Sequence, residues 1–169
     1  MPQSGCESAG TSILIVRNES DDSKDMLLWK WLKGSPTTLA AFGDPQNSAD
    51  YALCIYATPS ETLLSGGQLR VPKSSKWTPQ GSRGWKYDDG MGSADGAQKL
   101  RLTSSSHAKS KATLKGGGPA LPDLVLPLDP SLPLRVQLLN TQTTTCFEST
   151  FVGGNVRRSD AVRFKAKSP

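Results

Sequence analysis

The sequence lacks several features that would place it in a common structural class. No stretch approaches the roughly 20 consecutive apolar residues of a membrane-spanning helix. The first twenty residues are polar and do not have the charged-then-apolar layout of a signal peptide. No segment shows a convincing amphipathic helical period. We therefore expect little or no helix, no membrane insertion, and a signal peptide that is not part of this chain.

Signatures of catalysis and of nucleic-acid recognition are missing as well. Histidine occurs once, and the three cysteines have no CxxC spacing, so a zinc site is not expected. The sequence contains no Gly-x-Ser-x-Gly elbow, and His107 lies in a serine-rich segment that is a poor scaffold for a general base. No nucleic-acid-binding module is recognisable. We expect a protein that is not an enzyme and has no nucleic-acid partner.

Turn-forming residues are abundant, with 16 Gly and 12 Pro among 169 residues. The length suits one domain. Short β-favouring runs lie between the turns, and residues 72–97 look irregular. We expect strands at residues 12–18, 26–32, 51–57, 98–102, 108–115, 134–140, 145–151 and 161–165, with a hairpin at Gly66-Gly67. This pattern predicts an all-β fold, an antiparallel β-sandwich of immunoglobulin-like or jelly-roll-like type, over residues 12–169, preceded by a disordered lead or linker at 1–11.

Two of these strands have informative side-chain patterns. Alternation over residues 26–32 places Leu27, Trp29 and Trp31 on one face, and the opposite face is also largely apolar. This predicts a strand that is covered on both sides. In residues 108–115 lysines alternate with small or apolar residues, which predicts a half-exposed strand with a lysine stripe of the kind that protects sheet edges.

The net charge of +5 is compatible with acidic polysaccharide or anionic envelope material as a partner, or simply with solubility. Three aromatic residues in loop-like sequence are the candidate binding residues: Trp77, Trp85 and Tyr87. They have two interpretations. They form a platform that stacks on sugar rings, or they cover the open end of the sandwich core, which is the interpretation we favour because such rings bury a large area.

Acidic residues in a glycine-rich loop offer the one candidate metal site. Asp88, Asp89 and Asp95 could supply oxygens to Ca²⁺, which needs six to eight of them. The spacing of an EF-hand is absent, so we favour turn-forming aspartates over calcium ligands. Calcium is the only cofactor that the sequence brings into consideration.

The order of short motifs along the chain resembles a recurring β domain near the C-termini of large secreted or surface proteins of myxobacteria-like bacteria. The resemblance covers nearly the whole chain from Cys6 onward. The motifs that carry it lie at residues 21–25, 29–34, 42–45, 51–56, 84–87, 95–96, 134–140, 146–148 and 164–167. No activity comes with this family, so the resemblance implies a place and an architecture. It implies an extracellular or cell-surface protein, with the periplasm as an alternative.

Cysteines in two strand-like runs fit that location. Cys54 and Cys146 are either two buried free thiols or a disulfide, and the resemblance favours the disulfide. Cys6 is then unpaired or bonded to something upstream. We expect a monomeric, non-catalytic accessory or interaction module that contacts polysaccharide, envelope material or another domain of its parent chain. The alternative is a structural spacer or anchoring domain without a ligand, and a hydrolytic enzyme comes third.

Overall fold

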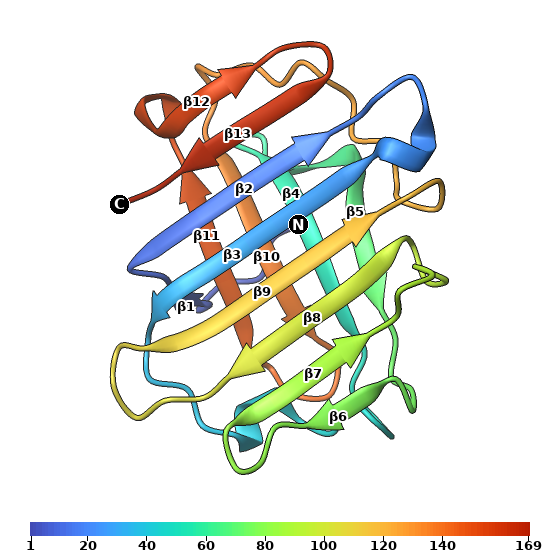
Figure 1. The fold of residues 1–169 in the computed structure, drawn as a ribbon. Coiled ribbons are helices and arrows are strands. Elements are labelled where there is room, and N and C mark those ends of the chain that lie inside the picture. Colours follow the sequence, from blue (N-terminus) through green and yellow to red (C-terminus); the bar gives the residue numbers. More distant parts are fainter.

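The computed structural model describes all 169 residues and contains no α-helix. Two β-sheets pack face to face, and the strands of the rear sheet cross those of the front one (Figure 1). The only helical elements are three single turns of 3₁₀ helix: η1 (Asp22–Lys24), η2 (Ala40–Phe42) and η3 (Gly153–Asn155). None of them is long or apolar enough to cross a membrane. The prediction of an all-β sandwich is confirmed.

The front sheet in Figure 1 has eight strands, and every neighbouring pair in it is antiparallel. We refer to it as the eight-stranded sheet. Its strands, in spatial order, are β12 (Val156–Ser159), β13 (Arg163–Lys167), β2 (Thr11–Arg17), β3 (Met26–Gly34), β9 (Ser110–Gly117), β8 (Ala97–Thr103), β7 (Gly84–Asp88) and β6 (Trp77–Pro79).

The rear sheet has five strands and is antiparallel except at one edge, where the short β1 runs parallel to β11. We refer to it as the five-stranded sheet. Its strands, in spatial order, are β1 (Glu7–Ser8), β11 (Cys146–Phe151), β10 (Leu134–Asn140), β4 (Tyr51–Ala57) and β5 (Thr62–Val71).

One hydrophobic core fills the space between the sheets. Trp29 and Trp31 of β3 are fully buried in it, as their alternation predicts. The indole Nε1 of Trp29 donates a hydrogen bond to Ser149 Oγ of β11 (3.1 Å), and that hydroxyl donates to Ser12 Oγ of β2 (2.7 Å). Every polar atom of this buried chain has a partner, so it joins the two sheets without an unpaired group.

Two segments differ from the sequence-based expectation. The region expected to be irregular contains the strands β6 and β7, and β5 continues through the expected hairpin at Gly66-Gly67 with a shift of its register against β4. Gly66 has a φ of +70°, and a Cβ placed on it would lie 2.0 Å from the carbonyl oxygen of Asp123. Glycine is therefore needed there because another part of the chain passes over the strand, not because the chain reverses.

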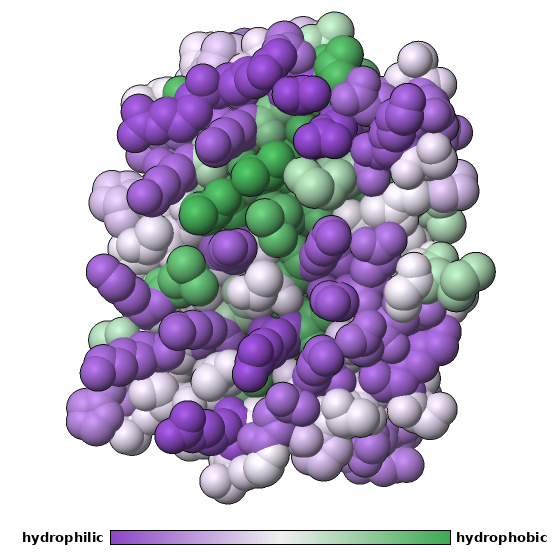
Figure 2. All heavy atoms as spheres, viewed as in Figure 1, coloured by the Kyte–Doolittle hydropathy of each residue, from purple (hydrophilic) through white to green (hydrophobic).

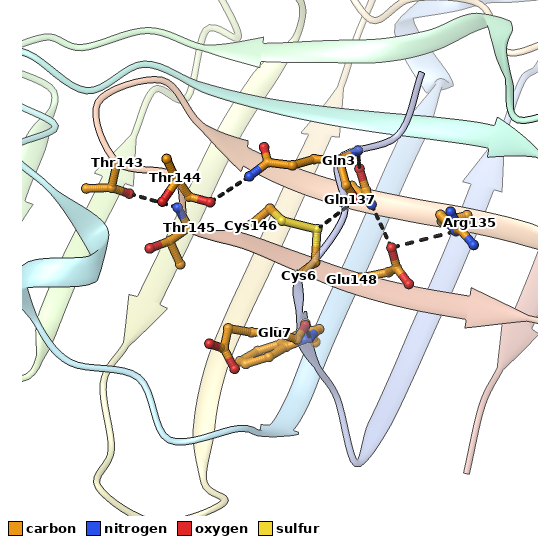
Figure 3. The surroundings of a disulfide bond; sticks show 11 residues. Gln3, Cys6, Glu7, Arg135, Gln137, Thr143, Thr144, Thr145, Cys146 and Glu148 are labelled. Atoms are coloured by element: carbon orange, nitrogen blue, oxygen red, sulfur yellow. Dashed lines mark hydrogen bonds and ion pairs between the residues drawn. A yellow bond between two sulfur atoms is a disulfide. The ribbon is translucent and has the colours of Figure 1, made fainter.

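The N-terminal segment is fixed to the five-stranded sheet and is not the disordered lead that the sequence suggested (Figure 3). The backbone N–H of Gln3 donates to Gln137 Oε1 (2.9 Å), and Gln137 Nε2 donates back to the carbonyl oxygen of Gln3 (2.8 Å). Residues 7 and 8 then add the parallel strand β1 to β11. A covalent bond reinforces this attachment.

That bond is a disulfide between Cys6 and Cys146, with a Cα–Cα distance of 4.6 Å. A disulfide was expected, but the pairing of Cys146 with Cys54 is wrong. Cys54 lies on β4 and Cys146 on β11, and β10 separates these strands. Two interstrand spacings amount to about 9.5 Å, which exceeds the reach of a disulfide of about 7 Å. Cys54 is a buried free thiol.

Candidate functional site

The predicted aromatic platform is not accessible to a ligand. Trp77 and Tyr87 are buried, and with Tyr51 they form a row of rings whose centroids are 5.6 and 5.4 Å apart. Trp77 Nε1 donates to the carbonyl oxygen of Pro72 (3.0 Å). Tyr51 belongs to the five-stranded sheet and the other two rings to the eight-stranded sheet, so the row closes one end of the core. Covering the core, the role that we favoured for these rings from the sequence, is the one that the structure gives them.

Trp85, the third residue of that group, is partly buried and packs against the same core. Its strand places it on the same face as Tyr87, pointing inward. Its Nε1 is buried without a hydrogen-bond partner. Trp85 is thus a core-edge residue, and a platform for sugar rings cannot be built from the three aromatic residues.

The three acids proposed as calcium ligands are not brought together. Each pairs with a different basic side chain: Asp88 with Lys86 (3.0 Å), Asp89 with Lys76 (2.7 Å) and Asp95 with Arg70 (3.4 Å). In the whole chain, no three His, Cys, Asp or Glu side chains converge in a way that could hold a metal ion. Hydrogen bonds from Lys76 and Ser93 hold the pKa of Asp89 well below its usual value, which suits a structural carboxylate in a turn.

The outward-facing surface of the eight-stranded sheet has an unusual composition. An apolar stripe runs along two neighbouring strands at its centre, formed by the half-buried Ile13 and Ile15 of β2 with Met26 and Leu28 of β3. Figure 2 shows this face, with an apolar patch near the centre and hydrophilic side chains around it. The expectation that β3 is covered on both sides is therefore wrong, because nothing packs on this side of the strand.

Basic side chains surround the stripe. We use "outer face" for the outward-pointing side chains of β13, β2, β3, β9, β8 and β7, which alternate with the core residues. The single acidic residue among them is Asp88. Ten of the 20 Lys and Arg residues of the chain belong to the outer face: Arg17, Lys30, Lys86, Lys99, Arg101, Lys111, Lys115, Arg163, Lys165 and Lys167.

Several of these charges are directly opposite a like charge on the next strand. Lys99 of β8 is paired in register with Lys115 of β9, and neither forms an ion pair; Asp88 of β7 lies opposite Lys99 on the other side but pairs with Lys86. Like charges in this position destabilise a sheet.

The lysine stripe was expected to protect a sheet edge, but β9 lies in the interior of the sheet, between β3 and β8. Its lysines do not protect an edge.

Ion pairing is unevenly distributed between this face and the rest of the surface. Twelve basic residues have no acidic partner within 4 Å, and ten of them lie on the outer face or at one corner of it. The corner contributes Lys33, Arg83 and Lys109. The two that lie elsewhere are Lys73 and Arg157.

The opposite side of the molecule provides a contrast. On the outward side of the five-stranded sheet, Arg135 pairs with Glu61 (2.9 Å). It also pairs with Glu148 (3.6 Å), and the N-terminal segment lies over Gln137, which is fully buried (Figure 3). The charge of Arg135 is neutralised there, and the N-terminal segment covers part of the sheet. The unneutralised positive charge of the protein is therefore concentrated on one flat side.

Sequence reasoning identified the lysines of β9 but not the outer face as a whole. A signal was present, since Lys99 and Arg101 of β8 and Lys165 and Lys167 of β13 also occupy alternate positions. Nothing in the sequence shows that these strands share a sheet.

Comparisons with models of protein families, with curated proteins and with solved structures found no match.

Proposed function

We propose that this protein is a non-catalytic binding module that attaches to acidic polysaccharide through the outer face. The observation that carries the proposal is the concentration of unpaired basic side chains on one open sheet surface that contains a single acid. A protein that needed positive charge only for solubility would gain nothing from placing Lys99 directly opposite Lys115. A polyanion lying across the strands would relieve that repulsion.

The apolar stripe supports a sugar polymer in particular. Sugar rings present C–H faces that pack on aliphatic side chains, and Ile15 and Leu28 lie side by side between Lys165 and Lys115. The chain of alternating rings and acidic groups in such a polymer matches a surface on which apolar and basic side chains are neighbours. The methylene stems of the lysines extend the apolar contact.

Other polyanions fit less well. Single-stranded nucleic acid is bound by stacking on aromatic rings, and the outer face has none. An anionic membrane would call for apolar side chains that project into the lipid, whereas Ile13, Ile15 and Leu28 are half-buried within their strands. The Cys6–Cys146 disulfide is typical of oxidising compartments. With the resemblance to domains of secreted proteins, it supports an extracellular or cell-surface location, where acidic polysaccharides occur.

The test compares two variants that each remove two positive charges. Lys99→Gln with Lys115→Gln changes the outer face, and Lys24→Gln with Lys73→Gln changes exposed lysines outside it. The salt concentration that elutes each protein from immobilised polyuronate is measured, with a neutral glucan and double-stranded DNA as parallel matrices. We expect wild type and the Lys24/Lys73 variant to elute together, and the Lys99/Lys115 variant to elute at clearly lower salt.

Three results would overturn the proposal. Equal losses in both variants would mean unspecific attraction by net charge. Tighter retention on DNA than on polyuronate would make the partner a nucleic acid. No retention on any matrix would leave a structural spacer as the function of the domain.

A further inference from the structure

A shallow hollow of about 630 Å³ lies at one corner of the outer face. It is bounded by the end of β3, the end of β8 and the connection to β9 at residues 104–109. The side chains around it are predominantly basic or hydroxylic.

The charge of this hollow is of one sign. Lys33, Arg83, Lys109 and Lys111 all contribute to it, none of them has an ion-pair partner, and no acid lines the space. A second, smaller hollow of about 390 Å³ adjoins it, shares Arg83 and adds Arg101 of the outer face. The hollow is therefore continuous with the surface that we propose to bind polysaccharide.

Hydrogen bonds fix the backbone around the hollow. Ser104 donates from both its N–H (2.6 Å) and its Oγ (2.8 Å) to the carbonyl oxygen of Arg83. Thr37 and Ser105 exchange two backbone hydrogen bonds (3.0 and 3.1 Å), and the N–H of Thr37 also donates to the buried hydroxyl of Ser110 (3.2 Å). The serine-rich connection is thus held to two other segments, and its shape does not depend on a ligand.

Lys33 reaches this corner through a strained conformation. It has a φ of 51°, in the left-handed region that non-glycine residues rarely occupy, and it lies where the register between β3 and β9 shifts. Gly34 follows it, and a Cβ there would lie 1.9 Å from the ring of Trp31. Such a bulge redirects a side chain, and strain of this kind is retained where the surrounding structure or a function requires it.

We propose that this corner hollow binds a tetrahedral oxyanion, the sulfate or phosphate ester group of an acidic polysaccharide. The inference rests on the proposed function, and it names the chemical group that the polymer should contain. A tetrahedral oxyanion offers oxygens in three directions, toward the Arg83 guanidinium, the ammonium groups of Lys33 and Lys109, and the hydroxyls of Ser105 and Ser106. A carboxylate has two oxygens in one plane and uses fewer of these donors. The space is also large enough for the sugar that carries the ester.

The first test is a titration followed by backbone amide shifts in NMR spectra. Sodium sulfate, inorganic phosphate and sodium acetate are added to the protein at constant ionic strength. We expect saturable shifts at Ser104, Ser105 and Ser106 with sulfate or phosphate and none with acetate. The tighter of the two tetrahedral anions identifies the ester. In the double variant Arg83→Gln with Lys109→Gln the binding should be roughly tenfold weaker, because a hydrogen bond between charged groups contributes that much or more.

The second test uses one polymer with three substituents: dextran sulfate, dextran phosphate and carboxymethyl dextran of matched charge density. We expect wild type to prefer an ester polymer, the Arg83/Lys109 variant to lose this preference, and the Lys99/Lys115 variant to bind all three polymers more weakly by the same factor. Equal binding of the three polymers by wild type, without saturable amide shifts, would overturn the corner site while leaving the proposed function intact. Failure of all three polymers to bind better than neutral dextran would overturn the proposed function instead.

Discussion

Asp89 is a carboxylate whose charge is held by several hydrogen bonds within the fold. Its nearly buried carboxylate accepts hydrogen bonds from Lys76 Nζ (2.7 Å), the Ser93 N–H (3.0 Å) and the Tyr87 hydroxyl (3.3 Å). The hydrogen bonds from Lys76 and Ser93 lower its pKa in the folded protein. A carboxylate with a lowered pKa stabilises the fold above its unfolded-state pKa of about 3.9, and this contribution is lost as the pH falls further, through the folded-state pKa.

We therefore predict that Asp89→Asn lowers the free energy of unfolding by about 2 kcal/mol at pH 7, the usual contribution of hydrogen bonds to a charged group. The difference from wild type should shrink below about pH 4, where the carboxylate of the unfolded chain starts to protonate while that of the folded protein stays charged. Urea unfolding at several pH values measures it. Asp88→Asn is the matched control, because its ion pair with Lys86 is exposed and should contribute less than about 1 kcal/mol. Equal effects of the two variants would contradict this assignment.

Cys54 gives a prediction that tests the disulfide pairing directly. The residue is 3% exposed, and burial raises the pKa of its thiol. Both effects slow alkylation, which requires an accessible thiolate. We expect iodoacetamide to leave the native protein unmodified at pH 8 and to modify one thiol per chain in denaturant. A non-reducing digest should join the peptides that contain Cys6 and Cys146. Rapid alkylation of the native protein at Cys6 would mean that the other pairing forms.

Among the strands, β8 and β9 bear lysines opposite each other, and the repulsion between these charges lowers the stability of the sheet. Lys115→Glu would place an acid directly opposite Lys99 and replace a repulsive cross-strand pair by an attractive one. We predict an increase in the free energy of unfolding of about 0.5–1 kcal/mol at low salt, together with much weaker retention on polyuronate. The increase should largely disappear in 1 M salt, because exposed charges are screened.

Lys30→Glu provides the control for this experiment. Lys30 lies opposite Ile13 and Thr113, so the same change of net charge relieves no directly opposite like charge. It should weaken polysaccharide retention without the gain in stability. If both variants gained stability equally, the effect would come from net charge and not from the register of β8 and β9.

Local sequence patterns located most strands well. Alternation and β-favouring residues place β2, β3, β4 and β10 within a residue or two of their observed bounds, since these strands have one face in the core. The short β6 and β7 were missed because Pro79 and Gly84 lie in them, and both residues usually argue against a strand. These two strands form because their partners, distant in the sequence, supply the ladder.

Long-range pairing also explains why the candidate site was only partly predicted. The alternating lysines of β9 are visible in the sequence, but only the register of β8 with β9 places Lys99 opposite Lys115 and Arg101 beside them, opposite Thr113. The predicted pairing of Cys54 with Cys146 was wrong for the same reason. Cys54 and Cys146 both lie on strands, as expected, but the sequence does not show that these strands share a sheet with β10 between them.

At the scale of the whole molecule, the two sheets differ in how their outward surfaces are covered and how their charges are paired. The five-stranded sheet is tied to the N-terminal segment by the Cys6–Cys146 disulfide, and its outward charges are paired. The eight-stranded sheet has an outer face that is open and bears the unpaired charge. A bound polymer should therefore protect one side of the protein and leave the other unchanged.

This asymmetry leads to a prediction for lysine reactivity. With saturating polyuronate, the rate of acetylation should fall several-fold at Lys30, Lys99 and Lys115, whose ammonium groups the polymer would cover. It should change little at Lys24 and Lys73, which lie outside the outer face. Mass spectrometry of the acetylated protein, with and without polymer, gives all five rates in one experiment. Uniform slowing at every lysine would show that the polymer surrounds the protein as a diffuse ion atmosphere, and the outer face would then have no special part in binding.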